Sequence, residues 1–350
     1  MYLFAILFLI LINICMKKSK YKINLYPVIV IILILYSGLR YNYSFDYENY
    51  LIHFNEINSL SSVISTGFEK GYSLLIFVFK ILGFGFNTFL LFIAFLSIKM
   101  KEKVFNRLSV FPEISLLIYF LLFYVSNDVE QIRHGISISF CFYSLIFLYK
   151  SDKKSNIISF SLIILGVLFH TSAMLFIPVY FIKDKVFSKK KYFIYFVISI
   201  LLSFINFYDF IVIFNDIFLH SQYITQKISI YASNKHSFVS LTLLIKCVTL
   251  CIFGIYVFDY KNKLHRLLFN TYYIGILYTI LLSSIPILVA RGTAYMRYSE
   301  LLMIPMYIQN IKNKENKKIH ILIITLLFSY YFFKFFILII NPEYFYYTTI

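Results

Sequence analysis

The sequence predicts an all-α, polytopic membrane protein with about 10–12 transmembrane segments, including a broken or re-entrant hairpin. Hydrophobic residues make up 60% of the 350-residue chain and charged residues only 14%, whereas soluble domains contain about 25% charged residues. Apolar runs also alternate with short Lys-rich loops along the chain. We expect residues 1–350 to form a single integral membrane domain with two large outer loops.

The formal net charge of +17 does not indicate a nucleic-acid partner. The lysines cluster in short loops, where positive charge marks the cytoplasmic side of a membrane. All four cysteines fall in apolar segments, and the seven histidines lack ligand spacing. The sequence therefore predicts no disulfide, no metal site and no cofactor.

The first two spans are expected at residues 2–16 and 25–39, joined by a cytoplasmic turn at Lys17–Lys22. The positive charges follow the first apolar run rather than precede it, which places the N-terminus outside. The polar, Tyr-rich segment 40–70 is then the first large outer loop.

Segment 71–98 leads from that loop to the basic loop Lys99–Arg107. If the basic loop is cytoplasmic, the segment must cross the membrane an odd number of times. We expect a partial helix to about Leu82, a break at Gly83-Phe-Gly85 and one crossing from Phe86.

A polar segment, Ser126–His134, lies between the outward run 112–125 and the inward run 136–149. Hydrocarbon tolerates its charges only where they pair, line a wet cavity or act on a ligand. A purely structural alternative has Asn127 capping a helix in which Glu130 pairs with Arg133.

Segment 156–182 has basic clusters at both ends, so both ends are expected in the cytoplasm. Its 27 residues are too few for two full spans of about 20 residues each. We therefore expect a broken, partly re-entrant hairpin whose bend near Gly166–Ser172 lifts His170 toward the outer face.

In the second half, segment 192–207 leads out to the second large outer loop, 208–237, and segments 238–258 and 267–289 cross in and out. The next inward helix is expected to begin near Thr293, which puts Arg297 in its first turns. Segment 319–340 is the last crossing and leaves the C-terminus outside.

Arginine is distributed differently from lysine. Four of the six arginines lie at the predicted outer face: Arg40, Arg133, Arg291 and Arg297. The planar guanidinium matches phosphate oxygens in a two-point contact that an ammonium cannot make. This predicts an outer-leaflet, phosphate-bearing ligand, and the alternative is structural pairing with Asp46, Glu48 or Glu130.

Short motifs occur in order along nearly the whole chain: Gly38-Leu-Arg40-Tyr41 with Asp46-Tyr47 and Tyr50, Glu69-Lys-Gly71-Tyr72, Gln131-Ile-Arg133, Phe169-His170-Thr-Ser172, Arg297-Tyr298 and Asn341-Pro-Glu-Tyr344. In these motifs the chain resembles the EpsG-like group of Wzy-type polysaccharide polymerases, which extend exopolysaccharide, capsule or O-antigen chains. Where that group has an Ala-rich stretch after Gln-x-Arg, this chain has Gly135-Ile-Ser-Ile-Ser139.

The resemblance implies a glycosyltransferase of the bacterial cytoplasmic (inner) membrane. Its substrate would be an undecaprenyl-pyrophosphate-linked oligosaccharide, joined to another such unit at the outer face. The implied partners are this lipid-linked substrate, membrane lipid and, as further candidates, a chain-length regulator and a flippase.

In such a reaction, Gln131 and the four outer arginines would bind the pyrophosphate of the donor, which gains charge as the leaving group. Asp46, Glu48 or His170 would deprotonate the acceptor hydroxyl. An equal alternative for His170 is a packed residue at a helix break.

Two other functions stay open. A lipid-linked oligosaccharide flippase or another secondary transporter also uses broken helices, although transporters usually contain internal repeats and none is visible in this sequence. An O-antigen ligase-like glycosyl transferase shares the lipid-linked donor and differs only in its acceptor.

Overall fold

The computed structural model describes residues 2–17, 24–41, 46–204, 241–311 and 317–340. Within these ranges the assigned elements are helices and no strand occurs, which confirms the all-α fold class. The predicted outer loop 208–237 and the motif Asn341–Tyr344 lie outside the described residues.

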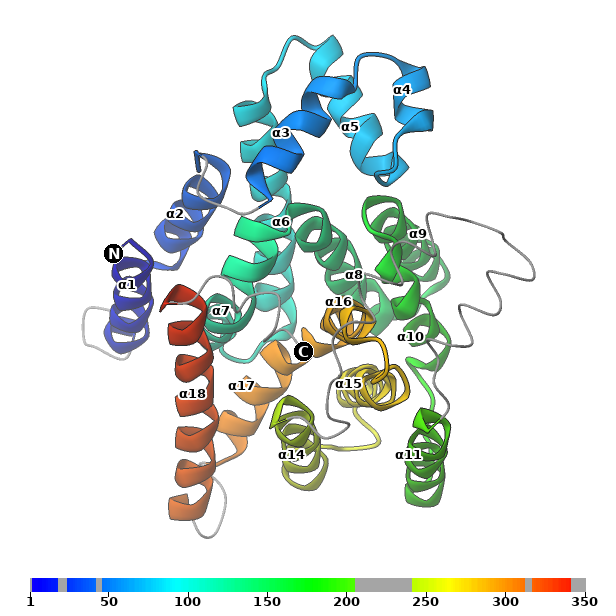
Figure 1. Cartoon of the computed structure of the whole chain (residues 1–350). Coiled ribbons are helices and arrows are strands. Elements are labelled where there is room, and N and C mark those ends of the chain that lie inside the picture. The colour runs from blue at the N-terminus through cyan, green and yellow to red at the C-terminus, as the bar shows by residue number, and fades with distance from the viewer. Residues whose placement is uncertain (1, 18–23, 42–45, 205–240, 312–316, 341–350) are drawn as a thin grey trace. The chain divides into compact units, whose positions relative to one another are not determined.

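The chain divides into two compact units, whose helices are labelled in Figure 1. Unit 1 ends at Met174 and resumes at Leu301, and unit 2 runs from Leu175 to Glu300. The helices up to the first boundary are α1 (Tyr2–Lys17), α2 (Tyr26–Gly38), α3 (Tyr47–Glu56), α4 (Leu60–Ser65), α5 (Lys70–Ile81), α6 (Phe86–Leu108), α7 (Pro112–Tyr119), the π-helix η1 (Phe120–Glu130), α8 (Ile132–Lys150), α9 (Lys153–Phe169) and the 3-10 helix η2 (Thr171–Phe176). Those that follow are α10 (Ile177–Ile182), α11 (Lys189–Ser203), α14 (Leu241–Tyr256), α15 (Lys263–Leu281), α16 (Pro286–Arg297), α17 (Glu300–Ile311) and α18 (Lys317–Ile340).

Three stretches of helix in the described residues are long and apolar enough to cross a membrane: Pro112–Glu130, Ile132–Lys150 and Lys317–Ile340. Shorter apolar helices occur at Tyr2–Met16, Tyr26–Gly38, Thr171–Ile182 and Leu243–Tyr256. Together with the hydrophobic composition, these helices identify an integral membrane protein.

Helix α8 forms the centre of unit 1, where it packs against α6 on one side and α9 on the other (Figure 1). Small residues permit this close packing. A Cβ atom on Gly135 would lie 2.1 Å from the carbonyl oxygen of Asn127, so any larger residue would push the π-helix away from α8. Ser137 donates a hydrogen bond of 2.7 Å to the carbonyl of Gly166 in α9. The Gly-Ile-Ser-Ile-Ser segment is therefore a helix-packing surface.

The predicted break at Gly83-Phe-Gly85 is confirmed, because α5 ends at Ile81 and α6 begins at Phe86. Gly83 has φ +79°, a left-handed conformation that glycine adopts without strain. The predicted basic loop Lys99–Arg107 is wrong: α6 continues through it to Leu108.

The structural alternative for the Ser126–His134 segment is also wrong. Residues up to Glu130 belong to the π-helix, and Gln131, with φ −99° and ψ 66°, separates it from α8. Asn127 therefore does not cap α8. Arg133 pairs with Glu69 from a distant part of the chain rather than with Glu130.

Helix α9 ends at Phe169, and His170 adopts an extended conformation before the 3-10 helix begins. The chain thus breaks inside the predicted bend at Gly166–Ser172. Asp152 fixes the other end of α9, where its side chain accepts a hydrogen bond of 3.0 Å from the backbone N–H of Ser155.

In unit 2, α15 packs against α10, α11, α14 and α16. Asn262 caps α15 by accepting hydrogen bonds from the N–H groups of Leu264 and His265. The predicted helix start near Thr293 is wrong, because α16 begins at Pro286, with proline in its first turn, and Arg297 is its last residue.

Candidate functional site

Three separated motifs of unit 1 meet at the side chain of Glu69. Its Oε2 atom accepts a charged hydrogen bond from Nη1 of Arg133, in the first turn of α8. Its Oε1 atom lies 3.4 Å from the backbone nitrogen of Thr171, which follows α9. The side chains of Arg133 and Glu69 are 23% and 14% exposed, so the pair remains reachable from outside the unit.

Backbone packing brings Glu69 to this position. A Cβ atom on Gly71 would lie 2.7 Å from the carbonyl oxygen of Leu168, so glycine lets the start of α5 approach the end of α9 closely. Glu69 is the residue before α5, and Thr171 follows the break in α9. In the Glu-Lys-Gly-Tyr motif, Glu69 therefore supplies the carboxylate, and Gly71 permits the close helix packing that positions it.

Aromatic rings surround the guanidinium of Arg133. Its Cζ atom lies 4.2 Å from the centroid of the Phe68 ring and 5.8 Å from that of Tyr50. The ring of His53 stacks on Phe68, with the centroids 3.8 Å apart and an interplanar angle of 9°. His53 Nε2 also lies 3.0 Å from Oγ of Ser73.

Residues 50–69, part of the segment predicted as the first outer loop, thus supply much of the wall of the site. Burial lowers the pKa of His53 to about 4, and repulsion from Arg133 acts in the same direction while Glu69 opposes it. His53 is therefore neutral at physiological pH and does not compete with Arg133 for an anion.

Arg40 is the second cation of this cluster. It is only 7% exposed, and one guanidinium nitrogen, Nη1, donates to the carbonyl of Ser37. Its Nε and Nη2 atoms have no hydrogen-bond partner among the described residues, which exclude 42–45. Tyr50 and Tyr72 lie within electrostatic range of both Arg40 and Arg133. A buried guanidinium with donors to spare is suited to an anionic ligand.

His170 lies beside this cluster and is buried. Its ring centroid is 4.9 Å from that of His134 in α8. Its Nδ1 atom lies 2.6 Å from Oγ of Ser172, which fixes the orientation of the ring. The structure thus brings His170 together with Arg133 through Glu69 and Thr171.

The remaining predicted residues of unit 1 are less central. Asp46 is the half-buried residue before α3 and lies in electrostatic range of Tyr50. Glu48 is exposed in the first turn of α3, and no contact with Arg133 or His170 is found for it within the described residues. Gln131 forms the junction between the π-helix and α8, and its carbonyl accepts a hydrogen bond of 2.8 Å from Gly135.

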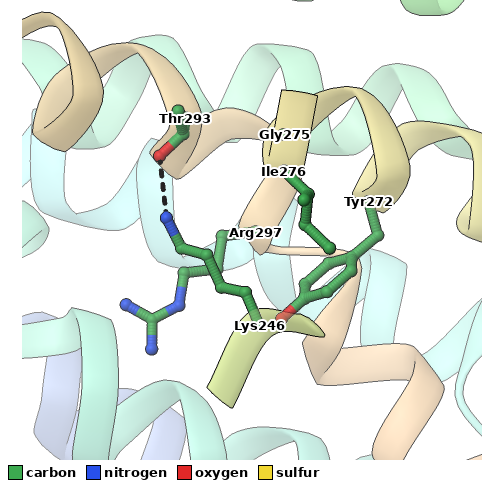
Figure 2. A pocket seen from close by; sticks show the side chains of 6 residues that line it. All are labelled: Lys246, Tyr272, Gly275, Ile276, Thr293 and Arg297. Carbon is green, nitrogen blue, oxygen red and sulfur yellow. Dashed lines mark hydrogen bonds between the residues drawn. The ribbon is translucent and has the colours of Figure 1, made fainter. Parts of the chain in front are cut away.

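Arg291 and Arg297 belong to unit 2, where both are part of α16 rather than of an outer loop. Nε of Arg297 donates to Oε2 of Glu300 over 3.3 Å. Arg297 also lines a narrow pocket together with Lys246 and Thr293 (Figure 2). The four arginines predicted at the outer face are therefore divided between the two units.

Sequence reasoning missed three charged residues. Glu69 lies in the Glu-Lys-Gly-Tyr motif, but no local sequence pattern gives it a role. Lys101 belongs to the predicted basic loop, yet it is fully buried. Lys246 stands alone in an apolar run, which is itself the signal of a functional or paired charge in a membrane segment.

The unit 1 cluster can bind an anionic group through Arg40 and Arg133 and can accept a proton at Glu69 or His170. Within the described residues, no group of three or more His, Cys, Asp or Glu side chains is arranged to hold a metal ion.

Comparison with known proteins identifies the family. A sequence model of the EpsG family matches residues 23–349. No curated protein and no solved structure matches the chain. The family match covers nearly the whole chain and agrees with the motif resemblance, so the chain belongs to the EpsG family, a family of Wzy-type polysaccharide polymerases.

Proposed function

We propose that this protein joins undecaprenyl-pyrophosphate-linked oligosaccharide repeat units at the outer face of the bacterial cytoplasmic membrane. Membership of the EpsG family indicates a polysaccharide polymerase. The observation that supports the specific reaction is the convergence of Arg40, Glu69, Arg133 and His170 in one partly accessible cluster of unit 1.

The reaction is a glycosyl transfer between two lipid-linked units. A new bond forms between the acceptor hydroxyl oxygen and the anomeric carbon of the donor sugar. The bond from that carbon to the pyrophosphate oxygen breaks, and the lipid pyrophosphate leaves with the electron pair. Negative charge grows on the leaving group, so the guanidinium groups of Arg40 and Arg133 stabilise the transition state more than the ground state.

The acceptor hydroxyl must lose its proton as the new bond forms. Glu69 and His170 are the groups of the cluster that can accept a proton. Glu69 also holds the guanidinium of Arg133 by a charged hydrogen bond, which orients its remaining donors. We assign proton acceptance to His170 or Glu69 ahead of Asp46 and Glu48, because Glu69 contacts both Arg133 and Thr171, the neighbour of His170, whereas Glu48 is exposed in the first turn of α3 and Asp46 precedes that helix.

Purified protein in detergent provides the test. The free energy of the transfer comes from the sugar–pyrophosphate bond, so the authentic lipid-linked repeat unit should be sufficient as substrate, without nucleotide or ion gradient. The measurement is chain growth on a gel, with Arg40→Ala and Arg133→Ala as inactive variants. A folded wild-type protein that moves the lipid-linked unit across vesicles and never lengthens the glycan would be a flippase. Transfer of the glycan only to a different acceptor would identify a ligase.

A further inference from the structure

The two arginines of the proposed site each follow the end of a helix in unit 1. Arg40 comes two residues after Gly38, where α2 ends, and Arg133 is the second residue of α8, just after the π-helix. The last carbonyl groups of a helix have no backbone N–H partner within that helix. The ends of α2 and of the π-helix therefore offer carbonyl oxygens to side chains.

Ser37 connects these two helix ends through both of its oxygen atoms. Its hydroxyl donates a hydrogen bond to the backbone carbonyl of Asp128, in the last turn of the π-helix. Its own backbone carbonyl accepts a hydrogen bond from Nη1 of Arg40. Ser37 is 0% exposed, so bulk water cannot replace either partner. One residue thus joins the guanidinium of Arg40 to the π-helix.

A second hydrogen bond supports the register of α2 against the π-helix. The hydroxyl of Tyr124 donates to the backbone carbonyl of Leu33 over 2.7 Å. Leu33 precedes Ser37 by four residues, and Tyr124 precedes Asp128 by four residues. The two contacts therefore lie about one helical turn apart on both helices, and the position of α2 along the π-helix is fixed at two points.

Asp128 is itself held on its other side. Its carboxylate is bound by the ammonium of Lys101 and by the hydroxyl of Tyr119. Nζ of Lys101 also donates to the carbonyl of Gly135 over 3.4 Å, two residues after Arg133 in α8. Asp128 therefore connects the π-helix to the helix that carries Arg133, while its backbone carbonyl holds the end of α2.

We infer that Ser37 is a positioning residue, which fixes the guanidinium of Arg40 relative to that of Arg133 through its contact with Asp128. The inference rests on the proposed function, in which the two guanidinium groups stabilise one leaving group. Nη1 of Arg40 is held by Ser37, while Nε and Nη2 have no hydrogen-bond partner among the described residues, which exclude 42–45. The carbonyl of Ser37 thus sets the direction of these two donors, and donors stabilise a growing charge only when they already point toward it.

The test compares two buried serines. Ser37→Ala removes the hydroxyl that binds Asp128 and keeps the backbone carbonyl that binds Arg40. Ser144→Ala is the matched control, because Ser144 is also 0% exposed and its hydroxyl donates to the carbonyl of Cys141 within α8. Each change removes one buried hydrogen bond, so we expect similar, small decreases in melting temperature.

The first measurement is the rate at which an arginine-specific dicarbonyl reagent modifies Arg40 in full-length protein without substrate, read by peptide mass spectrometry. Arg40 is 7% exposed, so its modification should be slow in the wild type. Relative to the exposed Arg107, we expect it to be about three-fold faster in Ser37→Ala and unchanged in Ser144→Ala. Equal rates in the wild type and Ser37→Ala would overturn the inference.

The second measurement is the initial rate of chain growth as a function of the concentration of the lipid-linked repeat unit. Arg40 is proposed to act on charge that grows in the transition state, so Ser37→Ala should lower kcat about ten-fold and change KM less than about two-fold. Ser144→Ala should keep both constants. A kcat loss of the same size in both variants would show a shared stability effect and would overturn the positioning role.

Failure of the proposed function gives a different result. Full chain growth in Arg40→Ala would show that Arg40 has no part in the reaction, and the contact of Ser37 with Asp128 would then only hold α2 in place. Inactive Arg40→Ala together with wild-type kcat in Ser37→Ala would leave the reaction standing and contradict the positioning role of Ser37 alone.

Discussion

The ammonium of Lys101 lies 2.7 Å from each of the two carboxylate oxygens of Asp128, and the two side chains are 0% and 1% exposed. Asp128 also accepts hydrogen bonds from the hydroxyls of Ser97 and of Tyr119, the latter over 2.6 Å. This buried ion pair joins α6 to the π-helix that precedes Gln131 and Arg133. It fixes the segment from which the proposed phosphate-binding arginine projects.

Breaking this pair should be strongly destabilising, because one partner would stay buried without its counter-charge. We expect Lys101→Met to lower the free energy of unfolding by about 3–5 kcal/mol, measured by denaturation in detergent. The double variant Lys101→Met, Asp128→Leu should recover part of that loss, since it removes both charges.

Lys103→Met is the matched control. Lys103 is exposed on the same helix, so its loss should change the unfolding free energy by no more than about 0.5 kcal/mol. Equal effects of Lys101→Met and Lys103→Met would show that the buried pair does not stabilise the fold.

Much of the helical architecture could be predicted because it depends on local signals. Gly83 and Gly85 end one helix and precede the next, and residues 166–172 contain the end of α9. Both breaks follow from backbone preferences of a few neighbouring residues, which the local sequence shows. The pairing of Lys101 with Asp128 could not be predicted from the sequence. Lys101 lies within a cluster of basic residues, and such a cluster is also what marks a cytoplasmic loop. The pairing of Glu69 with Arg133 joins positions 64 residues apart, and no local pattern specifies it.

Arg133 should not be replaceable by lysine. One guanidinium nitrogen of Arg133 is held by Glu69, and the planar group lies over Phe68. The ammonium of a lysine is a compact charge without the rigid, planar donor geometry of a guanidinium. It therefore cannot bind the Glu69 carboxylate and a phosphate at the same time in the way arginine can. We expect Arg133→Lys to lower chain growth about 100-fold or more, close to the loss in Arg133→Ala. The polymer length distribution on a gel reports this effect.

The protein level of both variants is checked by immunoblotting of membranes. Full chain growth in Arg133→Ala at a normal protein level would leave only a structural role for this residue.

Gly71 should be essential for the position of Glu69. In Gly71→Ala the new methyl group would clash with the carbonyl of Leu168 at 2.7 Å, so α5 must move away from the end of α9. We expect a stability loss of about 1–3 kcal/mol and at least a ten-fold loss of chain growth. Thermal unfolding and the gel assay measure the two effects.

Gly67→Ala is the control from the same loop, because a Cβ atom there meets nothing within 4 Å. It should be close to neutral in both assays. A Gly71→Ala protein that is as active as Gly67→Ala would refute the close approach of α5 and α9.

The proposed outer position of segment 40–70 can be tested by cysteine accessibility in intact cells. Single cysteines are introduced into a protein without its native cysteines, at Asn58 between α3 and α4 and at Val186 between α10 and α11. We expect a membrane-impermeant thiol reagent to label position 58 and not position 186, since the basic cluster around the latter predicts a cytoplasmic location. Labelling of position 186 from outside would contradict the expected hairpin at 156–182.

The stability of the segment predicted as the first outer loop should depend on His53. Its pKa in the folded protein, about 4, lies below the ordinary value of 6.5, so the unfolded chain takes up the proton first as the pH falls. The stabilisation is fully present above pH 6.5 and is lost as the pH falls toward 4. By linkage, the loss in the free energy of unfolding between pH 7 and pH 5 is about 2 kcal/mol.

We therefore expect the melting temperature of the wild type to fall more over this range than that of His53→Gln, whose amide can still bond to Ser73. Parallel pH profiles of the two proteins would show that His53 titrates normally in the fold, and would remove the basis for its neutral state beside Arg133.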